Sequence, residues 1–219
     1  MSAERIARLR ATLDRRQPDL TVVLEGVHKP HNLAAVLRSC DAVGVWQAHA
    51  VTREARTRWQ VSSAVGAAKW VEVEVWEEVG AVLGSLRERG FQIWAAHLDE
   101  GARDFRSLDY TGPTAFLLGQ EKLGVTAEAL AAVDGSVAIP MVGLVTSLNV
   151  SVAAALLLFE AQRQRSGAGL YDAPRLPEEA RTRRLFEWAW PELAAYCRRH
   201  GLPYPRLDEN GDLAEPLPR

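Results

Sequence analysis

Short apolar runs alternate with amphipathic stretches along most of this chain, and that alternation is the feature that most limits its fold. The runs predict strands at 20–24, 45–51, 69–75, 91–96, 115–118 and 137–141, and the stretches between them predict helices at 32–42, 79–89, 126–133 and 147–165. Repeated strand–helix–strand units predict an α/β fold, with a mostly parallel sheet and helices on both of its faces. Another helix is predicted at 2–16, and the proline-rich end at 167–219 predicts an accessory helical extension.

The length and composition suit one medium domain with terminal extensions. The chain has 219 residues, of which 47% are hydrophobic, so it can bury a sizeable core. This composition excludes a disordered chain, a collagen-like chain and a disulfide scaffold. The two cysteines, Cys40 and Cys197, are far apart and favour a reduced, cytoplasmic protein. The arginine-containing start, 1–10, lacks the apolar core of a signal peptide.

The uncharged segment 137–159 is long enough to cross a bilayer. It holds Pro140, Gly143 and several hydroxyl and amide side chains, which suit a strand, a loop and then a buried helix. We therefore expect no membrane span.

Arginines gather at the two ends of the chain, although the formal net charge is only −2. All but three of the 26 basic residues are arginine, and many of them lie at 5–16 and 181–199. Basic helices beside a neutral body favour a polyanionic partner, whereas solvated helix faces are the plainer interpretation. The candidate RNA-binding residues are Arg8, Arg10, Arg15, Arg16, Arg183 and Arg184.

Ligands of parallel α/β sheets bind at the carboxyl ends of the strands, so the loops there are the candidate sites. Three loops carry suggestive residues: 28–32, with Arg38 further along the helix; 118–124; and 139–149. The glycine-bearing loop at 118–124 lacks the lysine of a Walker loop, and no G-x-G-x-x-G or G-x-S-x-G motif follows a strand. His28 and His31 have no third ligand nearby, so no metal site is expected.

Taken singly, these residues also have plain structural interpretations. Asn32 could cap its helix, and Arg38 could form a surface ion pair. Glu121 suits a solvated turn, while Ser147 could be an N-cap and Asn149 a first-turn residue.

The order and spacing of three runs resemble the motifs of a known family. HKPHNLAAVLRSCDAVG (28–44), LLGQEKLGV (117–125) and IPMVGLVTSLNVSVAAALLLFEAQRQR (139–165) resemble the SpoU, or TrmH, family of 2'-O-ribose RNA methyltransferases in the SPOUT superfamily. Three further runs, RRQPDL (15–20), DFRSLDYTGPT (104–114) and GLPYPRLDENG (201–211), resemble the branch that acts on tRNA guanosine-18. The resemblance covers about residues 4–212 and implies a C-terminal trefoil knot, which periodicity cannot predict.

The resemblance also implies site residues, position by position. Asn32, Arg38, Glu121, Ser147 and Asn149 match the catalytic positions of the three motifs. Positions that hold S-adenosylmethionine are matched by Ala96, His97, Leu98, Gly119, Gly124, Ile139, Met141 and Leu148. Family members often carry threonine where Ala96 stands, and the loop 53–68 varies among them, so the resemblance gives that loop no role.

The resemblance further implies a homodimer that methylates tRNA without a metal and without a membrane. In the family, the arginine matching Arg38 reaches the partner's cofactor site, and the apolar helix predicted at 147–159 would be covered by the partner. The implied organisation is a basic helix at 1–18, a knotted methyltransferase domain at 19–166 and a helical extension at 167–219. Two alternatives stay open: a relative acting on ribosomal RNA, and a catalytically silent RNA-binding homologue.

Overall fold

The computed structural model describes residues 2–52, 69–120 and 123–214, and it divides into two compact units. One unit spans residues 17–170, and the other combines residues 1–16 with 171–219. The loop 53–68 and the predicted catalytic residue Glu121 lie outside the described residues.

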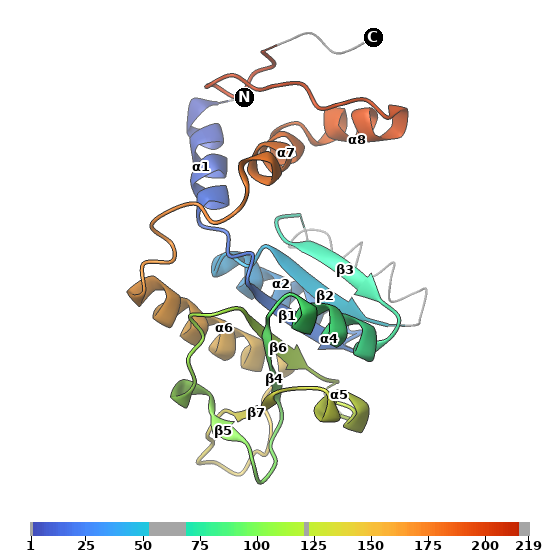
Figure 1. The fold of residues 1–219 in the computed structure, drawn as a ribbon, viewed down its shortest axis with the longest axis vertical. Helices are drawn as coiled ribbons and strands as arrows, with labels where there is room; N and C mark the ends of the chain where they lie inside the picture. The colour runs from blue at the N-terminus through green and yellow to red at the C-terminus, as the bar shows by residue number, and fades with distance from the viewer. Residues whose placement is uncertain (1, 53–68, 121–122, 215–219) are drawn as a thin grey trace. The chain divides into compact units, whose positions relative to one another are not determined.

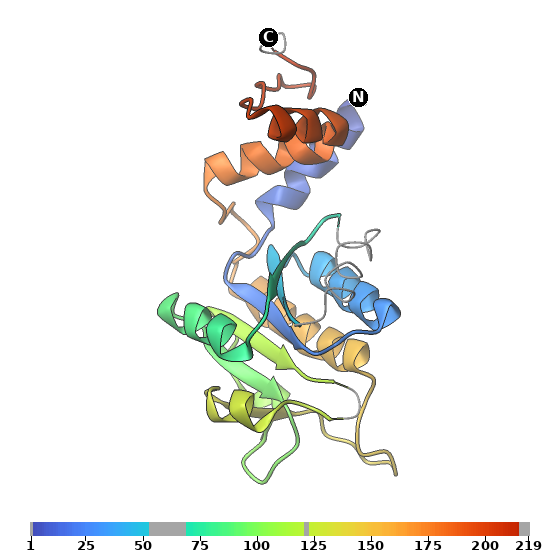
Figure 2. The ribbon, with the colours of Figure 1, turned by 90° about the vertical axis from the view of Figure 1, so that its right-hand side faces the viewer.

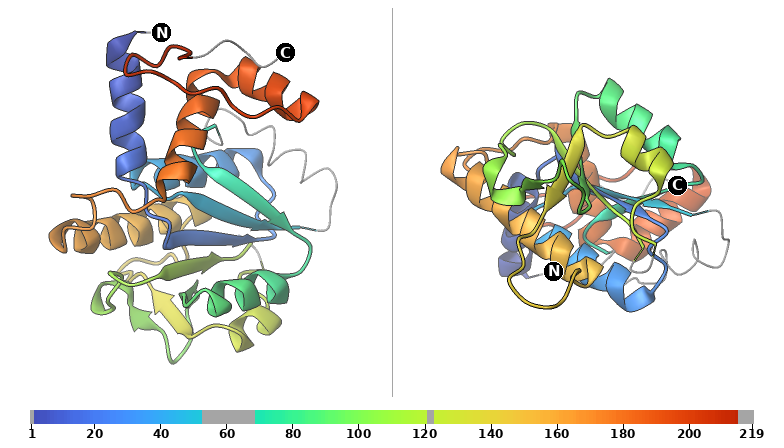
Figure 3. Two further views of the ribbon diagram at one scale, coloured as in Figure 1. Left: turned by 45° about the horizontal axis from the view of Figure 1, so that its top comes forward. Right: turned by 90° about the horizontal axis from the view of Figure 1, so that it is seen from below.

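The described part of residues 17–170 is built on a parallel sheet of seven strands. They are β1 (Leu20–Glu25), β2 (Gln47–Val51), β3 (Glu72–Trp76), β4 (Gln92–Ala96), β5 (Arg103–Asp104), β6 (Thr114–Leu118) and β7 (Gly135–Ala138). Their order is β3-β2-β1-β6-β4-β7-β5 (Figures 1 and 3). Leu24 pairs with Leu118, and Ala95 with Leu117, so the carboxyl ends of β1, β6 and β4 meet at one edge.

Helices cover both faces of this sheet. One face packs on α2 (Pro30–Ala42) and α6 (Val150–Gly167), and the other packs on α4 (Val79–Glu88) and α5 (Ala127–Ala131) (Figure 2). The central strands β1 and β6 are buried along their whole length, as strands covered on both sides must be. The predicted α/β fold is therefore confirmed, while the knot stays an expectation of the family resemblance.

Several predicted boundaries differ from the structure. Strand β5 and the 3₁₀ turn η1 (Phe105–Ser107) were not predicted, because elements of two or three residues carry no periodicity. Strand β7 ends at Ala138, three residues earlier than predicted. Helix α6 begins at Val150 instead of at residue 147, because the side-chain oxygen of Asn149 accepts a hydrogen bond from the Ser151 main-chain amide and caps the helix there.

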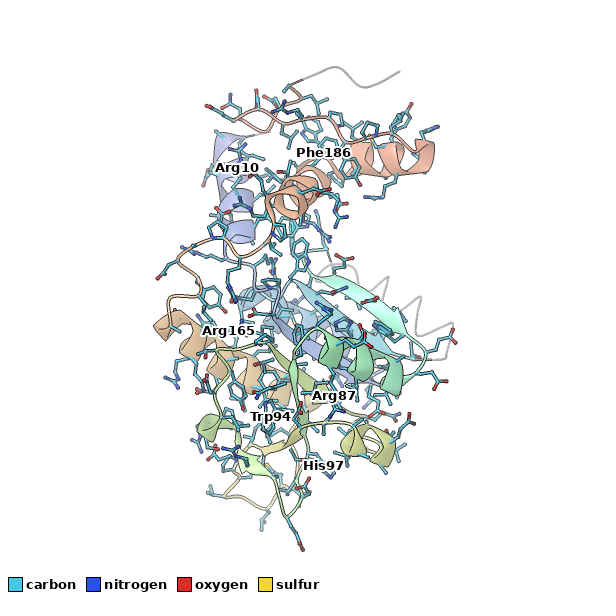
Figure 4. All side chains as sticks on the ribbon, in the orientation of Figure 1. Arg10, Arg87, Trp94, His97, Arg165 and Phe186 are labelled. Atoms are coloured by element: carbon cyan, nitrogen blue, oxygen red, sulfur yellow. The ribbon has the colours of Figure 1, made fainter. Side chains whose placement is uncertain are left out.

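The buried side chain of Arg165 joins three parts of this unit (Figure 4). Its guanidinium donates to the carboxylate and the carbonyl of Asp19, at 2.7 and 3.0 Å, next to β1. It also donates to the carbonyls of Tyr110 and Gly112, at 2.9 and 2.6 Å, and to the Gln17 amide oxygen at 3.1 Å. The C-terminal end of α6 is thereby fixed to the segments that precede β1 and β6.

The second unit is helical. It contains α1 (Ala3–Asp14), α7 (Glu178–Ala189) and α8 (Pro191–His200). Helix α1 buries Ile6, Leu9 and Leu13, which is the apolar face predicted from the sequence, and it packs on α7. The sequence predicts two separate extensions at the ends of the chain, whereas in the structure the two ends form one unit.

The C-terminal segment after α8 closes this unit. Phe186 of α7 stacks on Tyr204, with ring centroids 4.7 Å apart, and the Trp190 indole donates to the Gly211 carbonyl at 2.9 Å. Among the described residues of both units, no helix combines the length and the apolar character that crossing a bilayer requires. The segment 137–159 instead forms the end of β7, a loop and the start of α6.

Candidate active site

A cavity of about 280 Å³ opens at the carboxyl edge of the sheet, between the ends of β4, β6 and β7 and the start of α6. All eight residues predicted to hold the cofactor line it: Ala96, His97, Leu98, Gly119, Gly124, Ile139, Met141 and Leu148. Figure 4 labels His97 in the loop that follows β4. Residues from three separate loops thus surround one space, which is mostly apolar and suits a small organic ligand.

One wall of this cavity is main chain. A Cβ atom on Gly119 would lie 2.1 Å from the carbonyl group of Gly124 and 2.4 Å from the Val125 nitrogen, so position 119 accepts only glycine. Gly124 itself has φ +69°, a conformation that side chains rarely adopt. The wall at this point is therefore closely packed main chain, with no room for a side chain at position 119.

Sequence reasoning missed several residues of the lining. They include Leu118, Gln120, Val137, Thr146 and Val150. Each lies within three residues of a predicted position, so the nearest clue was its place at a strand end or a helix start.

Two predicted catalytic residues meet beside the cavity. The side-chain amide of Asn149 donates to the side-chain oxygen of Asn32 at 3.2 Å, joining the first turn of α2 to the start of α6. Asn32 is only 2% exposed. Helix α2 begins at Pro30 with Lys29 as its cap, so the interpretation of Asn32 as a helix cap is wrong.

Ser147 and Asn149 differ from their plain structural interpretation, in which Ser147 caps the helix and Asn149 lies in its first turn. Asn149 is the N-cap of α6, and Ser147 is an exposed residue that lines the cavity. The idea that Ser147 caps the helix is therefore wrong, because the helix starts three residues later than the sequence predicts.

Arg38 lies on α2, six residues after Asn32, with its side chain exposed. It stands outside the described lining of this chain's own cavity. The structure thus brings Asn32, Ser147 and Asn149 to the site, and leaves Arg38 accessible to a molecule outside it.

An exposed carboxylate follows the lining residues at the end of β4 directly in the sequence. Asp99 follows the lining residues His97 and Leu98, and a hydrogen bond from the Ser136 side chain holds the pKa of its carboxyl below the usual range. The amide of Gly101 also donates to Asp99, at 2.8 Å, and acts in the same direction. Asp99 is therefore ionised at neutral pH.

The candidate RNA-binding arginines of the helical unit differ in exposure. Arg8, Arg15 and Arg183 are exposed. Arg10 and Arg184 are half-buried: Arg10 donates to the Asp208 carbonyl at 2.8 Å, and Arg184 lies 3.3 Å from Glu187.

Arg16 is fully buried, with its guanidinium over the Trp188 ring, 5.3 Å from the ring centroid. The prediction that Arg16 faces RNA is corrected here. Helix α1 ends at Asp14, so Arg16 turns into the unit instead of continuing the exposed helix face.

A parallel α/β sheet whose carboxyl edge holds a glycine-walled, mostly apolar cavity is typical of proteins that bind a small organic ligand. The chain belongs to the SpoU rRNA Methylase family, which residues 19–159 match, and residues 163–216 match the C-terminal segment described for SpoU rRNA methylases.

Individual relatives cover most of the chain. The tRNA (guanosine(18)-2'-O)-methyltransferase of Escherichia coli (strain K12) is 50% identical over 215 residues, which are 97% of this chain and 94% of the relative. The crystal structure of the A. aeolicus TrmH/SpoU tRNA modifying enzyme matches with a TM-score of 0.78 and 39% identity, over 87% of this chain and 97% of that one.

A solved structure with bound AdoMet also matches much of this chain. The AdoMet-bound rRNA methyltransferase from Sinorhizobium meliloti is 28% identical, with a TM-score of 0.60, over 71% of this chain and 59% of that one.

Proposed function

We propose that this protein transfers a methyl group from S-adenosylmethionine to the ribose 2'-hydroxyl of a tRNA, with guanosine-18 as its target. The observation that carries this proposal is that all eight predicted cofactor positions surround one cavity, with the Asn32–Asn149 pair beside it. The 50% identity to the Escherichia coli tRNA (guanosine(18)-2'-O)-methyltransferase supports the tRNA substrate.

The residues of the cavity fit an adenosine-containing ligand. Ile139 and Leu148 offer apolar side chains for the base, and Gly119, which has no side chain, lets a ligand approach the main chain closely. Bound S-adenosylmethionine would supply a methyl group that is already strongly electrophilic. The protein's tasks are then to place the ribose hydroxyl in line and to stabilise its developing negative charge.

Arg38 suits the second task better than it suits proton abstraction. A guanidinium holds its proton too tightly to act as a base, and a nearby phosphate stabilises its charged form. We assign Arg38 to holding a phosphate or the emerging alkoxide, with the proton leaving through water or a substrate phosphate. Asn32 would hydrogen-bond the ribose or phosphate, and Asn149 fixes its side chain.

We also propose a homodimer in which α6 lies at the interface. Val152, Leu156 and Phe159 lie at helical spacing on α6 and are 47%, 40% and 50% exposed. The loop before α6 adds Val142 and Leu144, both fully exposed. Large apolar side chains gathered in this way favour a covering partner. A second copy would also bring its own Arg38 to the site, as the family resemblance implies.

The exposed arginines of the helical unit are proposed to hold the tRNA backbone, because phosphate contacts by arginine supply most sequence-independent affinity. Both cysteines are buried thiols, which suits the proposed cytoplasmic location, where tRNA is found.

The test is to incubate the protein with labelled S-adenosylmethionine and unmodified tRNA and to map the methylated nucleotide. We expect one 2'-O-methylated guanosine, at position 18. The variants Asn32→Ala and Arg38→Ala should bind S-adenosylmethionine within about twofold of wild type and lose roughly 100-fold in turnover, the scale for removing a group that stabilises developing charge.

Other outcomes separate the alternatives. Label in ribosomal RNA alone would support the relative acting on ribosomal RNA, and cofactor binding without transfer to either RNA would support the silent homologue. Loss of cofactor binding in Arg38→Ala would contradict the role assigned to that arginine.

A further inference from the structure

The carboxylate of Glu25 lies at the end of β1, outside the cavity lining. It is only 7% exposed. One of its oxygens accepts the Thr126 hydroxyl at 2.6 Å, and the other accepts the Thr126 amide at 3.0 Å. Thr126 is the residue at which the cavity's main-chain wall ends and α5 begins, and its hydroxyl in turn accepts the Ala129 amide at 3.2 Å.

The next residue, Gly26, contacts the other end of the same loop. A Cβ atom at Gly26 would lie 2.4 Å from the Gln120 side-chain nitrogen, so this side chain packs directly on the Gly26 backbone. Between these two contacts, Gln120 and Gly124 exchange main-chain hydrogen bonds of 3.1 and 2.8 Å. The end of β1 therefore contacts the chain on both sides of the main-chain wall, at Gln120 and at Thr126.

This attachment has a consequence for the cavity. The wall at Gly119 relies on the close approach of Gly124 and Val125, which immediately precede Thr126. Because Thr126 is exposed, water can replace Glu25 as its partner, so losing Glu25 would release the end of the loop instead of leaving buried groups unpaired. Small misplacements of such a wall weaken binding far more than they weaken the fold.

We infer that Glu25 is a positioning residue for the cofactor, acting through Thr126 to fix the main-chain wall of the cavity. This inference rests on the proposed function, because it takes S-adenosylmethionine as the ligand. Glu25 also connects the cofactor cavity to the candidate catalytic residue Asn32, since β1 leads directly into α2, which carries Asn32.

The experiment measures S-adenosylmethionine binding by calorimetry for wild type, Glu25→Gln, Thr126→Val and the double variant. Glutamine keeps the shape of Glu25 but can accept only one of the two donors. Valine keeps the shape of Thr126 but removes its hydroxyl. Each single variant should raise the dissociation constant about tenfold, the scale of one hydrogen bond to a charged group. The double variant should raise the dissociation constant by much less than the product of the two single factors, because both substitutions act on the same hydrogen-bonded contact.

A matched control is Asp109→Asn. Asp109 also accepts both the amide and the hydroxyl of a threonine, Thr111, at 2.9 and 2.7 Å, but it lies outside the cavity lining. Its variant should keep the wild-type dissociation constant. In steady-state assays, Glu25→Gln should raise KM for S-adenosylmethionine and leave KM for tRNA unchanged, a difference that general destabilisation does not produce.

Dissociation constants within twofold of wild type for both single variants would overturn the inference while leaving the proposed function intact. A wild-type protein that binds no S-adenosylmethionine would overturn the proposed function, and this inference with it. If Glu25→Gln does not fold, Thr126→Val decides the question together with Thr126→Ser, which keeps both the hydroxyl that bonds Glu25 and the cap on Ala129 and should bind S-adenosylmethionine like wild type.

Discussion

Arg165 Nη1 donates to Asp19 Oδ1 at 2.7 Å, and this buried ion pair joins the C-terminal end of α6 to the residue before β1. The two residues are 146 positions apart. A buried guanidinium is tolerated only when its donors are paired, and here each nitrogen of Arg165 reaches an oxygen.

Replacing Arg165 with alanine should lower the free energy of unfolding by about 3–5 kcal/mol, because Asp19 and three carbonyls lose their partner in a mostly buried setting. Chemical denaturation followed by circular dichroism measures this. Arg163→Ala is the control on the same helix. Its pair with Glu160 is largely exposed on the arginine side, so the loss should be about 1 kcal/mol or less. Equal losses for the two variants would contradict the structural role of Arg165.

Ala96 lines the cavity where family members often carry threonine. If a hydroxyl there reaches the cofactor, Ala96→Thr should lower the dissociation constant for S-adenosylmethionine by about threefold to tenfold, one ordinary hydrogen bond. Titration calorimetry measures the change, and tRNA affinity serves as the internal control. An unchanged or weaker affinity would show that the backbone alone makes the contact at position 96.

The exposed arginines should give tRNA binding a steep dependence on salt. Replacing Arg8, Arg15 and Arg183 with glutamine should weaken binding to all tRNA species similarly. It should also lower the slope of log K against log salt by about 0.7–0.9 for each phosphate that the protein no longer neutralises. Arg16→Gln is the control: this buried residue should change thermal stability and leave the slope as it was. A wild-type slope in the triple variant would mean that these arginines only solvate helix faces.

The exposed face of α6 should decide the oligomeric state. Phe159→Arg puts a charge in the middle of the proposed apolar interface and should convert a dimer into a monomer at micromolar concentration, as judged by light scattering. Methylation should be lost with the dimer, because the proposal takes Arg38 from the partner. A wild-type protein that is monomeric and active would contradict both statements.

His49 should make stability depend on pH. It is buried on β2, where the Trp76 indole donates to its Nδ1 at 3.1 Å, and burial, helped by the positive charge of Arg89, lowers its pKa from 6.5 to about 4. The neutral ring therefore belongs to the folded state, and its contact with Glu74 at 3.3 Å is not a charge pair at neutral pH.

The direction of this pH dependence follows from the difference between the pKa of His49 in the folded and the unfolded state. Because unfolding raises the pKa of His49, acid favours the unfolded state. The contribution of neutral His49 to the free energy of unfolding is fully present above pH 6.5. It falls as the pH drops towards 4, by up to about 3 kcal/mol. His49→Asn keeps an acceptor for Trp76 and should flatten this part of the pH profile in urea denaturation. An identical profile in the variant would assign the acid sensitivity to other groups.

Periodicity was sufficient to predict the sheet and most of the helices, because buried parallel strands leave continuous apolar runs. It could not predict the burial of Arg16 or Arg165. Both are arginines in partly polar stretches that the sequence predicts to be helical, and their partners lie far away in sequence or in another element. Charge patterning alone treats every arginine as exposed.

The site was predictable only in part. Family resemblance supplied all eight cofactor positions, and the structure brings them around one cavity. The attachment of Glu25 to Thr126 crosses 101 positions, so no local pattern indicates it, although a carboxylate at a strand end was a reason to look there. The boundary at Asn149 was misplaced because serine and asparagine are equally good caps.

The main-chain wall at Gly119 has a consequence for how such a site can evolve. The wall is formed by main-chain atoms and not by side chains, so side chains around it can change without altering its shape on that side. At position 119, by contrast, a single added methyl group would push against the Gly124 carbonyl. Substitutions around the wall are therefore tolerated more widely than at Gly119, where no side chain fits, or at Gly124, whose positive φ favours glycine.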